Sequence, residues 1–264
     1  MWHNLASLLR YRGLIQSLVA RDLKARYRGS VLGFFWSFVN PLLLLSIYSF
    51  VFTVIMKNTD EKTQPYAVFM FCGLLPWTWF SSSLNEAAGS LISGGNLIKK
   101  VLFPAEILPI VSVLTNMVHF LLGLIILAAF MVYNQHYPDW AQLGWFPIIV
   151  FVQLMLSLGL AFIVSALTVH FRDLKDLLAN LLTFWFFATP IIYFYGSDNM
   201  KPFKKYFNFN PFFHIAAAYQ EVLFFHGPFG AWAGLLAVAA GSIVVFLAGY
   251  WLFDRLRDSF AEAV

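Results

Sequence analysis

Long apolar runs recur along the sequence, and short polar connections separate them. The runs cover residues 31–56, 66–84, 107–133, 145–170, 177–195 and 231–253. A helix of roughly 20 apolar residues crosses a hydrocarbon core about 30 Å thick. The pattern predicts an all-α integral membrane protein with about six transmembrane helices, in a single membrane domain over residues 31–256. Pro190 interrupts the fifth run, so neighbouring helices or water must satisfy the carbonyl groups that it leaves free.

The composition excludes an ordinary soluble domain. Hydrophobic residues make up 60% of the chain, charged residues 11%, and the mean hydropathy is +0.73. A soluble domain is about a quarter charged, because its surface must face water. The single cysteine, Cys72, lies in an apolar run, which excludes an intramolecular disulfide framework and a multi-cysteine metal cluster.

Lysine and arginine are distributed unequally between the connections. Twelve of them lie in the N-terminal segment and after the second, fourth and sixth runs, and five lie in the other connections. Basic residues are enriched in the short cytoplasmic flanks of membrane spans. We therefore expect both termini in the cytoplasm, with residues 257–264 as a cytoplasmic tail.

Residues 1–30 have the pattern of an amphipathic helix that lies in the membrane interface. Apolar residues such as Ile15 and Leu18 share one side, whereas Arg21, Lys24 and Arg28 fall on another. Two interpretations stay open at this stage. The bases can be ordinary positive flank charges, or they can contact a partner subunit.

The connection between the second and third runs predicts a second cytoplasmic element. Gly94 and Gly95 break the preceding helix, Asn96 can cap a new one, and Pro104 limits its length. Such a helix is too short to span the membrane and carries a basic edge. It suits contact with a cytoplasmic subunit, although a lipid-facing loop is the alternative. In the connection after the fourth run, Arg172 and Asp176 are four residues apart, which favours a local ion pair.

The segment 196–230 is predicted to lie on the outer side and to contain a short helix. Asn210 followed by Pro211 is typical of a helix start, and Gly227-Pro228 limits the helix at its other end. A helix of this length, about 22 Å, cannot cross the bilayer. We expect a re-entrant or interfacial helix that acts as an aromatic anchor or as an external gate. The gate candidates are Asn210, Pro211, Phe212 and Phe213.

Aromatic residues make up 19% of the chain, more than two interfacial belts require. They form stripes at helical spacing in two of the runs. The stripes comprise Phe34, Phe38, Tyr48 and Phe52 in the first run, and Phe184, Phe187 and Tyr195 in the fifth. Packing between helices is one use of such a stripe. Lining a channel along which a sugar chain slides over flat aromatic faces is the other.

No motif for catalysis, nucleotide binding or metal binding occurs in the sequence. There is no G-x-x-x-x-G-K-[ST] phosphate loop and no H-E-x-x-H, and the six histidines are scattered. We therefore expect no catalytic, cofactor-binding or metal-binding residues and no enzymatic activity in this chain. Ionisable residues inside the runs are few, with Glu86 near the end of the second and His119 within the third. This scarcity disfavours an ion-coupled carrier.

Five blocks in fixed order resemble a known family. They are RDLKARYRGSVLGFFWSFVNPLLL at 21–44, NLIKKVLFPAEILP at 96–109, FRDLKD at 171–176, TPIIY at 189–193 and NPF at 210–212. Together they resemble the membrane subunit of polysaccharide-exporting ABC transporters of the type-2 superfamily, and the resemblance covers essentially the whole chain.

The resemblance implies a homodimer in the bacterial inner membrane that moves a lipid-linked polysaccharide, such as O-antigen, capsule or teichoic acid. Two separate ATP-binding subunits, which hold ATP and Mg, would dock beneath it, and no nucleic acid is involved. Other contacts would be with membrane lipids. The candidates for the ATPase interface are Arg21, Asp22, Arg26 and Tyr27 in the N-terminal helix, Lys99, Lys100 and Glu106 in the following cytoplasmic segment, and Arg172 and Asp173 after the fourth run.

A multispan glycosyl- or phosphotransferase acting on polyprenol-linked sugars is an alternative, as is the ion-coupled carrier. A transferase needs paired acids or a metal-binding aspartate cluster near a membrane face. The densest acidic group, Asp173 and Asp176, is interleaved with bases instead.

The charge distribution makes a prediction about topology. A reporter fused after Gln142 should be external, and one fused after Asp173 should be cytoplasmic. Paired alkaline phosphatase and green fluorescent protein fusions at both sites measure this directly. The reverse pattern at both sites would refute the predicted orientation.

Overall fold

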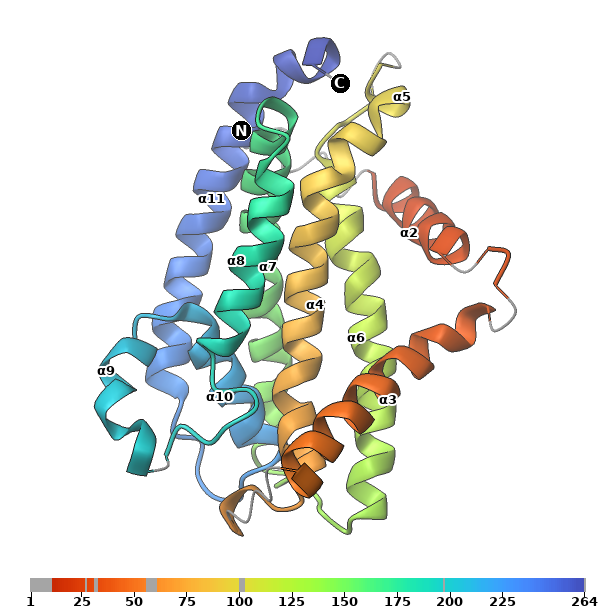
Figure 1. Cartoon of the computed structure of the whole chain (residues 1–264). Coiled ribbons are helices and arrows are strands. Elements are labelled where there is room, and N and C mark those ends of the chain that lie inside the picture. The colour runs from red at the N-terminus through yellow and green to blue at the C-terminus, as the bar shows by residue number, and fades with distance from the viewer. Residues whose placement is uncertain are drawn as a thin grey trace.

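The computed structural model describes residues 11–26, 28–30, 33–55, 61–99, 103–196 and 198–263. All regular elements in these ranges are helical (Figure 1). In chain order they are α2 (Arg12–Arg26), η1 (Gly33–Phe35), α3 (Trp36–Ser49), η2 (Phe50–Ile55), η3 (Glu61–Thr63), α4 (Tyr66–Ser93), α5 (Gly95–Ile98), α6 (Ile107–Tyr133), η4 (Leu143–Trp145), α7 (Phe146–His170), α8 (Leu174–Phe187), η5 (Asp198–Phe203), α9 (Lys204–Phe207), α10 (Pro211–Leu223) and α11 (Trp232–Ala263). The predicted all-α class is confirmed.

Four helices within these ranges are long and apolar enough to cross a membrane. They are α4, α6, α7 with its preceding turn η4, and α11. Their positions match the second, third, fourth and sixth predicted spans. Two run further than the apolar pattern indicates, since α4 continues to Ser93 and α11 to Ala263. Helical hydrogen bonding does not stop where the apolar run ends, so helices of this kind extend beyond the hydrocarbon.

The first and fifth predicted spans are shorter than expected. The first consists of α3 and the π-helical turn η2, with an apolar stretch of Trp36–Phe52. The fifth is α8, whose 14 residues cover about 21 Å. Pro190 therefore lies beyond the end of this helix and does not interrupt it, which corrects the predicted span of 177–195. The count of six membrane crossings stays a prediction.

The helix α4 lies at the centre of the molecule. Aromatic side chains along it are almost completely buried, among them Phe69, Trp79 and Phe80. Its neighbours are α3, α6, α7, α8 and α10. Because lipid tails are as apolar as these side chains, close packing and polar contacts hold such helices together rather than exclusion from water.

The closest helix pair is α7 with α11, where glycines allow the two backbones to touch. A Cβ atom added at Gly159 would lie 2.7 Å from the Phe246 backbone nitrogen. One added at Gly249 would collide with the Gly159 carbonyl oxygen. Small residues at the crossing are the usual means of such close approach in membranes.

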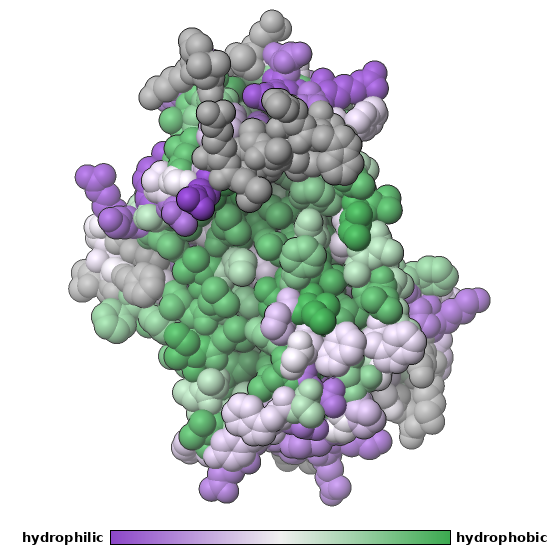
Figure 2. All heavy atoms as spheres, turned by 180° about the vertical axis from the view of Figure 1, so that it is seen from behind, coloured by the Kyte–Doolittle hydropathy of each residue, from purple (hydrophilic) through white to green (hydrophobic). Residues whose placement is uncertain are grey.

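The two ends of the molecule carry different elements. The helices α2 and α5 and the C-terminal part of α11 lie toward one end, whereas η5, α9 and α10 lie toward the other (Figure 1). Between them, one face shows a broad apolar surface, with polar side chains gathered toward both ends (Figure 2). This distribution is what a protein surrounded by a bilayer requires.

The close contact of α7 and α11 makes a prediction. Gly159→Ala should lower the melting temperature of the purified protein, because the added methyl group forces the backbones apart, at a cost of about 1–3 kcal/mol. Gly241→Ala, on the other helix of the pair, α11, is the control, since nothing lies within 4 Å of its Cβ position. Equal melting temperatures for the two variants would contradict the close contact.

Candidate functional site

The helix α2 rests on the membrane core through its apolar side. Leu18 is buried against Ile107 and Val111 of α6, with Leu14, Ile15 and Val19 beside it. The outer side of α2 carries an ion pair between neighbours, in which the Arg21 guanidinium lies 3.0 Å from the Asp22 carboxylate. Both side chains are exposed. This arrangement leaves two of the predicted interface residues accessible to a partner.

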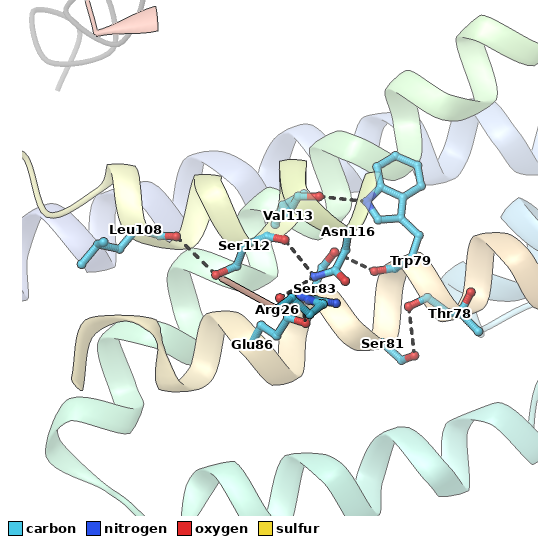
Figure 3. A network of polar contacts seen from close by, with 10 residues as sticks. All are labelled: Arg26, Thr78, Trp79, Ser81, Ser83, Glu86, Leu108, Ser112, Val113 and Asn116. Carbon is cyan, nitrogen blue, oxygen red and sulfur yellow. Dashed lines mark hydrogen bonds and ion pairs between the residues drawn. The ribbon is translucent and has the colours of Figure 1, made fainter. Parts of the chain in front are cut away.

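Arg26 does not point away from the protein. Its guanidinium donates to Glu86 Oε1 of α4 at 2.6 Å, and the second oxygen of Glu86 accepts from Asn116 Nδ2 of α6 at 2.8 Å. Figure 3 shows Arg26 and Asn116 both close to Glu86, which accepts from each of them. Asn116 also donates to the Ser112 carbonyl oxygen at 2.9 Å. The network ties α2 to both α4 and α6 by charge-assisted hydrogen bonds.

A groove of about 760 Å³ opens beside this network. Its charged lining residues come from three helices and carry both signs, and they are Arg21, Asp22, Glu86 and Lys175. The Lys175 ammonium lies over Gly89, where it would be 3.7 Å from an added Cβ atom. Mixed charges that converge on an open groove suit contact with a polar protein surface.

The predicted helix between the second and third spans is present but shorter than expected. It is α5, and it has Gly94 as its N-cap with no side-chain capping bond, so the predicted cap at Asn96 is wrong. Asn96 instead lies inside the helix, because α4 itself continues to Ser93. Lys99 is exposed at the end of α5. Lys100 and Tyr27 lie outside the described residues.

Glu106 lies inside the protein rather than on its surface. It is the N-cap residue of α6, with 3% relative exposure, and its carboxylate faces the Arg257 guanidinium of α11 at 3.9 Å. A carboxylate is stabilised at a helix N-terminus by the helix dipole. Within this chain Glu106 therefore joins α6 to α11, and it can affect a docked partner only through the positions of these two helices.

The connection between α7 and α8 presents Arg172 and Asp173 to the exterior, and both are exposed. Arg172 and Asp176 do not form the expected ion pair in the described part of the chain. Because α8 begins at Leu174, Arg172 precedes the helix, and the i, i+4 geometry does not apply.

The structure divides the predicted channel residues into two groups. Phe38, Tyr48 and Phe52 of the first stripe pack against the core of the same chain. Tyr48 contacts Phe186 of α8 at 6.1 Å between ring centroids, and Phe52 contacts Tyr66 of α4 at 5.6 Å. The side chain of Phe34 is outside the described part. Phe38, Tyr48 and Phe52 therefore pack between helices of the same chain.

The second stripe faces outward on α8. Phe184 is 74% exposed and Phe187 is 57% exposed, whereas Tyr195 packs on Phe213 with ring centroids 5.3 Å apart. Whether any of these residues lines a channel stays a prediction.

At the other end, Asn210 has the capping role expected and a second role besides. Its Oδ1 accepts from the backbone nitrogens of Phe212 at 3.0 Å and Phe213 at 3.3 Å, which confirms it as the N-cap of α10, with Pro211 at the first position. The same oxygen accepts from Trp185 Nε1 at 2.7 Å, and Nδ2 donates to Thr189 Oγ1 at 2.9 Å. One side chain therefore fixes the start of α10 to the end of α8.

Two further contacts hold α10 in place. Phe212 is buried edge-on against Trp77 of α4, with ring centroids 4.9 Å apart. At its C-terminal end, Glu221 accepts from the backbone nitrogens of Gly230 at 2.9 Å and Ala231 at 2.8 Å, just before α11 begins. The predicted gate candidates thus belong to a short helix attached to α4, α8 and α11.

Sequence reasoning missed the partners of these polar groups. It identified Glu86 as ionisable but not Asn116, and it treated Asn210 as a cap only. The available signal was a polar side chain within an otherwise apolar helix, which in a membrane needs a partner inside the protein. No group of three or more potential metal ligands occurs within the described residues.

Comparison with known proteins decides the family. Residues 13–224 match the model of the ABC-2 type transporter. The chain belongs to the ABC-2 type transporter family. Among ABC-2 relatives, the O-antigen export system permease protein RfbA of Myxococcus xanthus is 41% identical over 259 residues, 97% of each chain.

A protein of the same name from Klebsiella pneumoniae is 32% identical over 251 residues, 94% of each chain. The polysialic acid transport protein KpsM of Escherichia coli is 24% identical over 220 residues, which are 79% of this chain and 80% of KpsM.

The contacts of Asn210 make a prediction about stability. Asn210→Ala should lower the melting temperature of the purified protein, because it removes the cap of α10 and leaves Trp185 Nε1 without its acceptor. Loss of a cap alone costs about 0.5–2 kcal/mol. Asn208→Ala is the control, since the Asn208 contact with His214 uses the backbone carbonyl oxygen only. Equal melting temperatures for both variants would contradict the role assigned to Asn210.

Proposed function

We propose that this chain is the membrane subunit of an ATP-driven exporter that carries a polysaccharide outward across the bacterial inner membrane. The observation that carries the proposal is the 41% identity to an O-antigen export permease over 97% of both chains. At this identity and coverage the two proteins share one architecture.

The substrate in this proposal is a lipid-linked polysaccharide of the O-antigen type. The two O-antigen permeases are 41% and 32% identical to the chain, whereas the polysialic acid transporter is 24% identical and matches a smaller share. The ranking favours O-antigen over capsule as the exported class.

ATP hydrolysis is assigned to separate ATP-binding subunits. The sequence has no phosphate loop of its own. The end formed by α2, α5 and the α7–α8 connection presents the exposed charges that such a partner needs, including Arg21, Lys99 and Arg172. We assign this end to the cytoplasm, together with both termini, in keeping with the excess of basic residues.

A second copy of the chain completes the proposed exporter. Apolar side chains are exposed along α3, among them Leu43, Ile47 and Phe50, and along α8, among them Leu181 and Phe184. In a membrane, lipid or another copy can cover such faces. A homodimer is the arrangement we propose, because a polymer needs a path wider than one small helix bundle provides.

Reconstitution tests the function directly. The chain alone should not hydrolyse ATP. Vesicles that also contain the ATP-binding subunit that copurifies with the chain should move lipid-linked polymer in the outward sense only when ATP is supplied. Transport without the ATP-binding subunit, or driven by an ion gradient instead, would contradict the proposal.

Lys99 and Lys100, which follow α5 in the sequence, provide a mutational prediction. Replacing Lys99 and Lys100 together with Glu should weaken the complex with the ATP-binding subunit or uncouple its ATPase rate from export, because a charge-paired contact then becomes repulsive. Copurification yield and ATP hydrolysed per polymer exported measure the two outcomes. Lys205→Glu, at the opposite end of the molecule, is the control. Unchanged assembly and coupling would show that these lysines are flank charges only.

A further inference from the structure

Two histidine side chains from distant parts of the sequence meet near the C-terminal end of α10. His136 lies in the connection after α6, and His226 lies in the connection between α10 and α11. Their ring centroids are 5.3 Å apart, and the ring planes are inclined by 79°. Because the connection after α6 and the connection after α10 are far apart in the sequence, no spacing motif indicates this pair. The proposed export function does not use it.

The separation of the two rings matches that of two imidazoles bound to one tetrahedral ion. A ring nitrogen binds zinc at about 2.0–2.1 Å, which places the metal about 3.2 Å from the ring centroid. Two such rings at the tetrahedral angle have centroids about 5.2 Å apart. The rings of His136 and His226 are 5.3 Å apart. Edge-to-face packing alone gives a similar separation, so the state of the ring nitrogens must distinguish the two.

The hydrogen bond of His136 fixes which of its nitrogens can bind a metal. Its Nε2 lies 2.8 Å from the carbonyl oxygen of Phe224. A carbonyl oxygen only accepts, so Nε2 carries the hydrogen, and in the neutral ring Nδ1 carries the lone pair. Metal-binding histidines commonly donate their other nitrogen to a backbone carbonyl in this way. Stacking on the buried Phe224 ring, with centroids 4.5 Å apart, also fixes the plane of the imidazole.

His226 is the adjustable member of the pair. Its side chain is exposed, so it can rotate to direct a nitrogen at the same ion without displacing a packed neighbour. Its backbone follows directly from the end of α10, where the Phe225 nitrogen donates to the Gln220 carbonyl oxygen at 2.9 Å. Gly227, with a φ of +129°, then turns the chain toward α11. Water can also reach an ion at this position.

The acidic residues of these two segments have other partners. Asp139 Oδ1 accepts from the backbone nitrogen of Ala141 at 3.0 Å, and Glu221 Oε2 accepts from the backbone nitrogen of Gly230 at 2.9 Å. Among the described residues, no third potential ligand joins the two histidines in one group. The imidazoles therefore provide two of the four positions of a tetrahedral ion, and water provides the others.

We propose that His136 and His226 bind one divalent transition-metal ion of the zinc class, each through one ring nitrogen. Imidazole suits zinc, copper and nickel, whereas magnesium and calcium prefer oxygen ligands. The ion would join the connection after α6 to the connection after α10. Because His136 already bonds to the carbonyl of Phe224, the C-cap residue of α10, metal binding fastens this helix end further.

Zinc binding to the full purified chain, carrying no histidine tag, tests the proposal by calorimetry and thermal melting. We expect saturating zinc to raise the melting temperature by a few degrees. His226→Ala should weaken zinc binding at least about tenfold and abolish this rise, since loss of a supporting partner alone has an effect of that size. The melting temperature without zinc should not change, because the ring is exposed. Magnesium should give no rise.

His214→Ala is the matched control. His214 Nε2 contacts a backbone carbonyl oxygen, that of Asn208, as His136 does with Phe224, but its ring packs on Phe213 rather than on a histidine. This variant should keep the zinc affinity of the native chain. Combining His136→Ala with His226→Ala should weaken binding no more than the stronger single change, because one ion needs both rings.

Three results would overturn the proposal. They are equal zinc affinity in His226→Ala and His214→Ala, additive losses in the double variant, and a melting temperature raised equally by magnesium. If His136→Ala does not fold, the comparison of His226→Ala with His214→Ala decides alone. The assay uses neither ATP nor export, so its failure leaves the proposed function intact.

Discussion

A polar group on a helix that is enclosed in a membrane protein must find its partner inside the protein, and α4 carries several groups that bond to neighbouring helices. Its Glu86 carboxylate receives Arg26 from α2 and Asn116 from α6. Its Trp79 Nε1 donates to the Val113 carbonyl oxygen of α6 at 3.1 Å, and its Pro76 carbonyl oxygen accepts from Gln153 of α7 at 2.8 Å. The positions of three neighbouring helices thus follow from the polar groups of one.

The same helix connects the two ends of the molecule by packing. Near one end, Glu86 holds α2, the element that carries the exposed pair of Arg21 and Asp22. Toward the other, Trp77 packs on Phe212 of α10. A proposed exporter needs an end that receives a partner and an end that opens outward, and α4 places both on one rigid element. A cavity lined by Arg26 of α2 and Phe71 of α4 lies along this helix as well.

The sequence was informative where a physical rule acts locally. Apolar length predicts the four long helices, and the Asn210-Pro211 pair predicts the start of α10. It was less informative where contacts between residues far apart in the sequence determine the structure. Glu86 and Arg26 are sixty residues apart, so their pairing depends on how α2 folds back. The cap expected at Asn96 failed because α4 continues past its apolar stretch, and the ion pair of Arg172 with Asp176 failed because α8 begins two residues after Arg172.

The central claim is that the chain provides a membrane path for a polymer and does not make the polymer. Deletion of its gene, followed by separate measurement of surface polysaccharide and of lipid-linked polysaccharide in the cell, tests this claim most directly. The account predicts that the surface polymer disappears while its lipid-linked precursor accumulates inside, and that the intact gene restores export. Loss of the polymer from both fractions would contradict the account and would assign the chain to polymer synthesis, as expected for a membrane transferase.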